Sequence, residues 1–91
     1  MYTLDAKGRV IRQQKDVIKL TKNELKLLNL LKDGKTHTDQ EILEFVYGEG
    51  TYYSRSNLAV LIFRLRSNTG LVISRVREYG YILLDEIKDE I

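Results

Sequence analysis

Residues 54–84 read SRSNLAVLIFRLRSNTGLVISRVREYGYILL, and this stretch decides the fold class. Its first half predicts a helix over residues 54–68, because Thr69-Gly70 can close a helix. Its second half, residues 71–84, predicts two strands joined by a tight connection at Glu78-Tyr79. The C-terminal part of the chain is therefore expected to be a helix followed directly by a hairpin.

Two shorter helices are predicted before this stretch. Thr21 has Glu24 three residues later, which is the spacing of a capping box, and leucines then recur at helical spacing as far as Asp33-Gly34. Thr38 and Glu41 repeat the capping spacing at the start of a second helix. We expect this second helix to bury the apolar residues Ile42, Leu43, Phe45 and Val46.

The first twenty residues alternate short apolar runs with turn-forming residues, a pattern typical of a three-strand antiparallel meander. A length of 91 residues suits one domain with one modest core. The sequence thus predicts a single α+β domain over residues 1–91. Its expected parts are an N-terminal sheet at 1–20, a three-helix core at 21–68, a wing hairpin at 71–84 and a frayed acidic tail at 85–91.

The composition excludes several classes of protein. The chain has 43% hydrophobic and 31% charged residues, as folded globular domains do, and no apolar run long enough to span a bilayer, so we expect a cytoplasmic protein. It has no cysteine and one histidine, which leaves little material for catalysis or for a metal site. We predict that the chain is not an enzyme, has no cofactor or small-molecule substrate, and that His37 is an ordinary polar residue between two helices.

Positive charge is concentrated in one segment, although the net charge of the chain is only +2. Residues 51–77 contain no aspartate or glutamate but five arginines: Arg55, Arg64, Arg66, Arg75 and Arg77. Arg64 and Arg66 fall on the predicted third helix, and Arg75 and Arg77 are two residues apart on the hairpin, where a regular strand would point both to one side. A helix beside a basic prong can read bases and contact phosphates together, so double-stranded DNA is the predicted partner.

Four motifs in the right order resemble the OmpR/PhoB-type effector domains of bacterial response regulators. They are LTKNELKLL at 20–28, Glu41-Ile42-Leu43 with Val46-Tyr47-Gly48, Arg64-Leu65-Arg66, and Val76-Arg77 with Gly80-Tyr81. The resemblance covers nearly the whole chain. It implies a winged helix-turn-helix domain for transcription regulation, with helix 54–68 in the major groove and the wing 71–84 at the minor groove.

The resemblance also implies individual roles. Arg64 would reach bases, Arg66 would bind a phosphate and Arg77 would enter the minor groove. Val60 matches an apolar position that can touch a thymine methyl, Arg75 matches a wing position that contacts the DNA backbone, and Asn57 is a further contact. A loop containing Tyr52 and Tyr53 would touch RNA polymerase, and a homodimer on DNA is expected. The receiver domain of such regulators is absent from these 91 residues, which fits an excised domain or a stand-alone form.

One departure from the family supports a different function. Leu58–Phe63 are six apolar residues in a row, and a helix cannot bury all of them against one core. We expect Ala59, Leu61 and Phe63 to face outward, where they could form a protein-interaction or dimerisation surface on a domain with little DNA binding.

Two further features bear on the wing and on the choice of nucleic acid. Glu78 replaces the glycine beside the wing arginine, which places a negative charge close to the expected phosphate path. A third and weaker hypothesis is single-strand binding by base stacking on Tyr52, Tyr53 and Tyr79.

Overall fold

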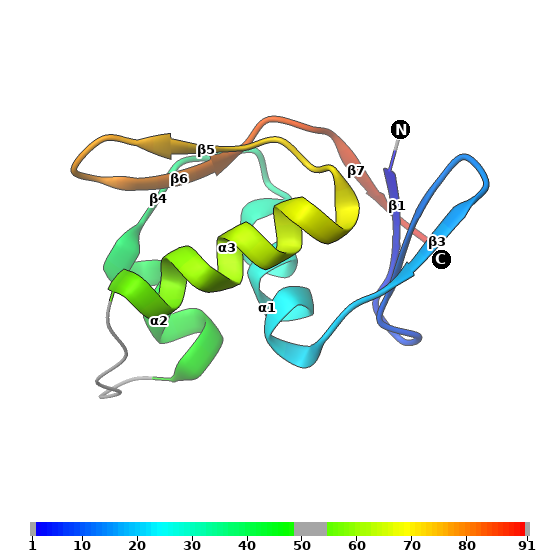
Figure 1. Ribbon diagram of the computed structural model, residues 1–91, viewed down its shortest axis with the longest axis horizontal. Helices are drawn as coiled ribbons and strands as arrows, with labels where there is room; N and C mark the ends of the chain where they lie inside the picture. Colours follow the sequence, from blue (N-terminus) through cyan, green and yellow to red (C-terminus); the bar gives the residue numbers. More distant parts are fainter. Residues whose placement is uncertain (1, 49–54, 91) are drawn as a thin grey trace.

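The computed structural model describes residues 2–48 and 55–90, with Arg55 described by its backbone alone. Three helices lie between an N-terminal sheet and a C-terminal wing (Figure 1). In chain order the elements are β1 (Tyr2–Asp5), β2 (Val10–Gln13), β3 (Asp16–Lys19), α1 (Lys22–Leu31), β4 (His37–Thr38), α2 (Asp39–Tyr47), α3 (Arg55–Thr69), β5 (Ile73–Val76), β6 (Gly80–Leu83) and β7 (Ile87–Asp89). The predicted α+β order of sheet, three helices and hairpin is confirmed.

The N-terminal sheet has the strand order β3-β2-β1-β7. The antiparallel meander β1-β2-β3 is present as predicted, with Leu4 opposite Ile11 in its buried centre. The expectation of a frayed tail is wrong, because β7 pairs in parallel with β1 and places Ile87 beside Tyr2. The free edge of β1 and the half-buried side chain of Ile87 explain this pairing, since an unpaired strand edge favours the addition of a strand.

Ion pairs also hold the acidic tail to the rest of the domain. Lys32 Nζ at the end of α1 lies 3.0 Å from Asp89 Oδ2, and Arg12 on β2 pairs with Glu90. Asp89 and Glu90 therefore neutralise cations of the N-terminal half, whereas Asp85 accepts a hydrogen bond from the amide of Val72, within the basic segment, at 2.6 Å.

The wing belongs to a second sheet of strand order β4-β6-β5. The two-residue strand β4, between α1 and α2, was not predicted, and it pairs Thr38 with Gly80 and His37 with Tyr81. Residues 77–79 connect β5 to β6, with Glu78 at a φ of +59°. Arg77 therefore lies in the turn, one residue beyond the strand on which the sequence pattern placed it.

Local capping interactions begin the first two helices. At α1 both halves of the predicted capping box are present: the Glu24 amide donates to Thr21 Oγ1 at 3.1 Å, and the Thr21 amide donates to Glu24 Oε1 at 2.8 Å. At α2 the Glu41 amide donates to Thr38 Oγ1 at 3.0 Å, but the Glu41 carboxylate turns to His37 instead. The backbone half of the second prediction is therefore confirmed and the reciprocal half is wrong.

The core is built from the apolar faces of the three helices with one face of each sheet. Ile42, Leu43 and Val46 of α2 are buried, as predicted, but Phe45 is 50% exposed. The prediction for Phe45 fails because the buried residues of α2 already fill one face, and Phe45 is turned about 100° from Val46, away from the core.

Candidate nucleic-acid interface

The third helix presents one apolar face to the core and one mixed face to solvent. Leu58, Leu61, Ile62 and Leu65 are buried. The exposed residues of α3, which we call the recognition face, are Ser56, Asn57, Ala59, Val60, Phe63, Arg64, Arg66, Ser67 and Asn68. This face contains two arginines and no acidic residue, so it can meet a polyanion without repulsion.

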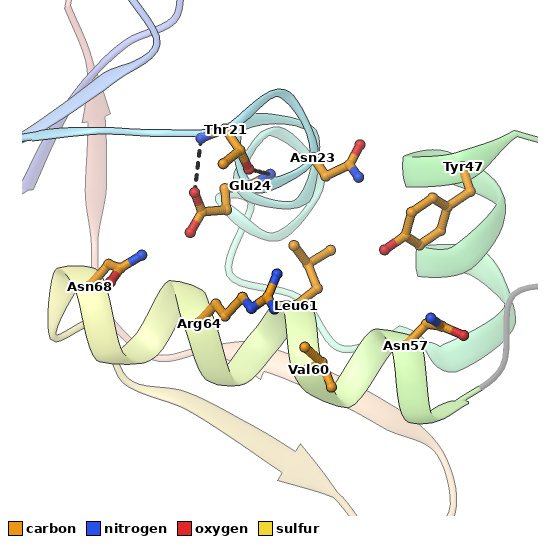
Figure 2. Close-up of a pocket in the computed structure, with 9 residues that line it drawn as sticks. All are labelled: Thr21, Asn23, Glu24, Tyr47, Asn57, Val60, Leu61, Arg64 and Asn68. Carbon is orange, nitrogen blue, oxygen red and sulfur yellow. Dashed lines mark hydrogen bonds between the residues drawn. The ribbon is translucent and has the colours of Figure 1, made fainter.

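The expectation that Leu61 faces outward is wrong, because only 8% of it is exposed. Residues two apart on an α-helix are separated by about 160° around its axis, so Ala59 and Leu61 cannot share a face. Figure 2 shows Leu61 on the side of α3 that faces α1. The exposed apolar residues of the helix are Ala59, Val60 and Phe63, which we call the apolar crest.

A groove of about 440 Å³ runs between the start of α1 and one side of α3 (Figure 2). Asn57, Val60 and Arg64 line it from α3, and Thr21 and Glu24 line it from α1. Arg64 is exposed, and the structure shows no ion pair for it among the described residues. The position predicted to reach bases is therefore at the edge of the recognition face with its charge available.

Among the residues that the structure describes, Glu24 is the one carboxylate that lines this groove. It is 3% exposed, and its Oε1 accepts from the Thr21 amide while Oε2 has no hydrogen-bond partner among the residues that the structure describes. Its position follows from the capping box, which fixes the side chain at the first turn of α1.

Arg75 and Arg77 of the wing have different environments. Arg75 Nη1 lies 2.6 Å from Asp39 Oδ1, and its guanidinium lies 5.0 Å from the centre of the Tyr81 ring. The hydrogen bond to Asp39 is the main cause that raises the pKa of Arg75. Arg77 is exposed in the turn of the wing. The two side chains therefore do not act as one prong: Arg75 ties β5 to the first residue of α2, and Arg77 is presented to solvent.

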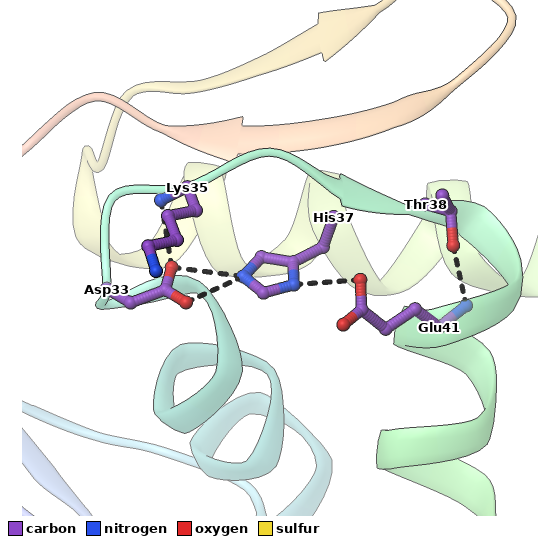
Figure 3. Close-up of polar contacts among 5 residues, drawn as sticks. All are labelled: Asp33, Lys35, His37, Thr38 and Glu41. Carbon is purple, nitrogen blue, oxygen red and sulfur yellow. Dashed lines mark hydrogen bonds and ion pairs between the residues drawn. The ribbon is translucent and has the colours of Figure 1, made fainter.

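His37 lies between two carboxylates at the base of the wing (Figure 3). Its Nε2 is 3.0 Å from both carboxylate oxygens of Asp33, and its Nδ1 is 2.9 Å from Glu41 Oε1. Burial alone would lower the pKa of His37, but its hydrogen bond with Asp33 and the nearby carboxylate of Glu41 outweigh burial and raise it. Burial likewise opposes the change at Asp33, whose pKa is lowered by its hydrogen bonds with His37 and the Lys35 amide. His37 thus joins the end of α1 to the start of α2.

We expect His37 to make the stability of the domain depend on pH. Its pKa is raised above the ordinary value of 6.5 in the folded state, so its stabilisation is complete below that value and is lost as the pH rises through the folded pKa. The urea concentration at the midpoint of unfolding should therefore decrease as the pH rises above about 6.5. The chain has one histidine, so His37→Gln should flatten this dependence. An unchanged slope in the variant would contradict the assignment.

Other kinds of site receive no support from the described ranges 2–48 and 55–90. No group of three or more metal-binding side chains is found there. No helix in those ranges is long and apolar enough to cross a membrane. The predicted polymerase-contact residues Tyr52 and Tyr53 lie outside the described ranges.

Comparison with known proteins decides the family. Residues 13–83 match the model of the family described as "Transcriptional regulatory protein, C terminal". The chain belongs to this family. As the sequence motifs predicted, it is a winged-helix effector domain of the OmpR/PhoB type, and such effector domains are not a class of enzymes.

Solved structures of other effector domains share the fold. The DNA-binding domain of Bacillus subtilis CssR superimposes with a TM-score of 0.84 at 24% identity, over 92% of this chain and 100% of that one. The C-terminal domain of the nisin resistance regulator NsrR, a lantibiotic response regulator, gives a TM-score of 0.74 at 26% identity over 92% of both chains. The DNA-binding domain of the response regulator AdeR, solved in complex with an intercistronic region, gives 0.76 at 21% identity over 93% of this chain and 94% of that one. No curated protein matches this chain in sequence.

The effector domain also exposes residues that sequence reasoning did not select. Ser56, Ser67 and Asn68 lie on the recognition face together with the predicted Asn57 and Arg64. A helical projection centred on the buried leucines would have found the two serines, because they fall on the side opposite Leu58 and Leu65, whereas Asn68 lies at the groove side of the helix.

Proposed function

We propose that this effector domain binds double-stranded DNA in a sequence-specific manner to regulate transcription, with α3 in the major groove and the wing at the minor groove. The observation that carries this proposal is the recognition face of α3, which exposes Arg64 and Arg66 on a helix that has no acidic residue. Arg77, exposed at the turn of the wing, adds a third positive charge. The complex of AdeR with an intercistronic region supports the same use of this fold.

The three exposed arginines have separate roles in this proposal. Arg64 contacts base edges, because its guanidinium can donate two parallel hydrogen bonds to guanine. Arg66 lies about 160° away around the helix and neutralises a phosphate. Arg77 reaches the minor groove from the turn of the wing. Asn57 and Val60 make further contacts from the α1 side of the recognition face.

We retain Arg75 as a DNA contact, but its main role in this proposal is to position the wing. Its bond to Asp39, a side chain that is 9% exposed, fixes the angle between the wing and α2. Its predicted contact with the DNA backbone would use donors that Asp39 does not occupy, since a guanidinium has five N–H groups. RNA polymerase contact through Tyr52 and Tyr53, and a homodimer on DNA, stay predictions.

The test is a selection from a random duplex pool, followed by fluorescence-anisotropy titration of the enriched sequence at two salt concentrations. Arg64→Ala and Arg77→Ala should each weaken binding to that sequence by roughly 1 to 3 kcal/mol, with a smaller effect on unrelated duplexes. Arg66→Ala should weaken all duplexes alike and make the salt dependence shallower, because it removes a phosphate contact.

Arg12→Ala is the matched control for these three variants. Arg12 lies on β2 in the N-terminal sheet and pairs with Glu90 of the tail, so it should leave DNA affinity unchanged. Equal losses for all four arginine variants on every duplex would show non-specific attraction alone and would contradict the proposal.

A further inference from the structure

The centre of the recognition face is apolar, and its edges are polar or positive. Val60 is 48% exposed and Phe63 is 68% exposed, the largest exposure among the large hydrophobic residues that the structure describes. They are three residues apart, and Ala59 is four residues before Phe63, so the three side chains adjoin on the helix surface. Ser56 and Ser67 continue the same line of the helix in both directions, since they are spaced seven and four residues from Phe63.

Cations flank this apolar crest on both sides. Arg64 lies on the side of the α1 groove, and Arg66 lies on the side that turns toward the wing. The three side chains of the crest therefore carry no hydrogen-bonding group, while the flanking arginines attract a polyanion. This charge pattern favours a DNA duplex as the occupant of the crest.

Inside the major groove, an aromatic side chain has one apolar target. Each base pair exposes hydrogen-bonding groups there, and the C5 methyl group of thymine is the only hydrocarbon group. A phenyl ring packed on any other base edge would remove water from donors and acceptors without replacing their hydrogen bonds, which is unfavourable. Phe63 should therefore discriminate in favour of thymine at the positions it covers.

We propose that Phe63, at the centre of the apolar crest of α3, reads thymine methyl groups in the middle of the target site, beyond the single methyl contact that the family resemblance implies for Val60, and that arginine contacts flank this methyl readout. This inference rests on the proposed function and specifies its substrate class: a duplex whose central major-groove positions carry thymine methyls. Specificity at these positions comes from hydrocarbon contact, and hydrogen bonding to bases is confined to the edges of the helix.

A protein partner is the competing occupant, and the size of the crest argues against it. A stable protein interface buries about 800 Å² on each partner. The crest ends at a serine on either side, and the other large exposed hydrophobic residues that the structure describes all lie outside α3: Val17, Phe45, Val72, Tyr79 and Leu84.

The experiment replaces single thymines of the selected duplex with deoxyuridine, which removes the methyl group and keeps every hydrogen-bonding group. We expect about a fourfold loss of affinity for each methyl that the crest covers, at one or two central positions only. In Phe63→Ala the thymine and uracil duplexes should bind equally at those positions. Ser67→Ala, a matched change one turn further along the same exposed line, should retain the wild-type preference for thymine.

The possible outcomes separate the inference from the function on which it rests. Specific binding of thymine and uracil duplexes with equal affinity would overturn the methyl readout and leave the proposed function intact. If the domain retains no duplex from the random pool, both the methyl readout and the proposed function are overturned. Loss of self-association by Phe63→Ala in analytical ultracentrifugation, with no preference for thymine, would assign the crest to a protein interface and overturn the inference.

Discussion

Replacing Gly80 with alanine is expected to destabilise the domain by more than about 3 kcal/mol, the upper part of the range for overpacked sites. An added Cβ would lie 1.7 Å from the His37 carbonyl oxygen and 2.8 Å from Thr38 Cα, so it would meet backbone that cannot rotate away. Relief requires β4 to separate from β6, which would release the wing from the helices. Urea denaturation followed by circular dichroism measures the loss.

Gly34→Ala is the matched control for this prediction. Gly34 has a φ of +76° but nothing within 4 Å of a built Cβ, so alanine there should cost only about 1 to 2 kcal/mol from backbone strain. Equal losses for the two variants would show that the close approach of β4 and β6 does not determine the effect at Gly80.

The second large effect is expected at Leu61, where alanine should lower the free energy of unfolding by about 2 to 5 kcal/mol. Leu61 is buried between α3 and α1, and its removal leaves a cavity. Phe63→Ala is the control on the same helix, and at a position that is 68% exposed it should change stability by no more than about 0.5 kcal/mol. Thermal and urea unfolding measure the free energy of unfolding of both variants. A larger loss of stability for Phe63→Ala than for Leu61→Ala would mean that α3 buries a different face.

Features encoded in neighbouring residues could be predicted from the sequence. The capping box at Thr21 and Glu24, the turn glycine Gly34 and the period of the leucines in α1 each involve residues only a few positions apart. The family motifs added the arrangement of the helices and the wing, which no local pattern contains. The exposure of Arg64 and Arg77 was predicted both from the local sequence pattern and from the family motifs.

Pairings between distant residues could not be predicted in the same way. The strand β4 exists because Thr38 meets Gly80, and β7 exists because Ile87 meets Tyr2. A strand of two or three residues is too short to show the alternation of apolar and polar residues from which strands are predicted. The bond from Arg75 to Asp39 escaped prediction for the same reason, so an arginine counted with the DNA contacts is also paired with a carboxylate of the protein.

The errors at Phe45 and Leu61 have another cause. Both residues are apolar and lie in apolar runs, and hydrophobicity alone does not say which members of a run face the core. The angle of 100° per residue settles this once the buried face is known. In α3 that face is set by Leu58, Ile62 and Leu65, which leaves Phe63 in solvent.

The parallel pairing of β1 with β7 determines how the domain responds to mechanical load. The first described residue, Tyr2, begins β1, and Asp89 ends β7, so a pull on the two chain ends draws these adjacent strands past each other. The interstrand hydrogen bonds, continued by the bond from the Glu90 amide to the Leu4 carbonyl, lie across the direction of the pull and are strained together in shear. A tether at both ends would thus meet its resistance in the N-terminal sheet, while α3 and the turn of the wing lie outside the direct path of the force.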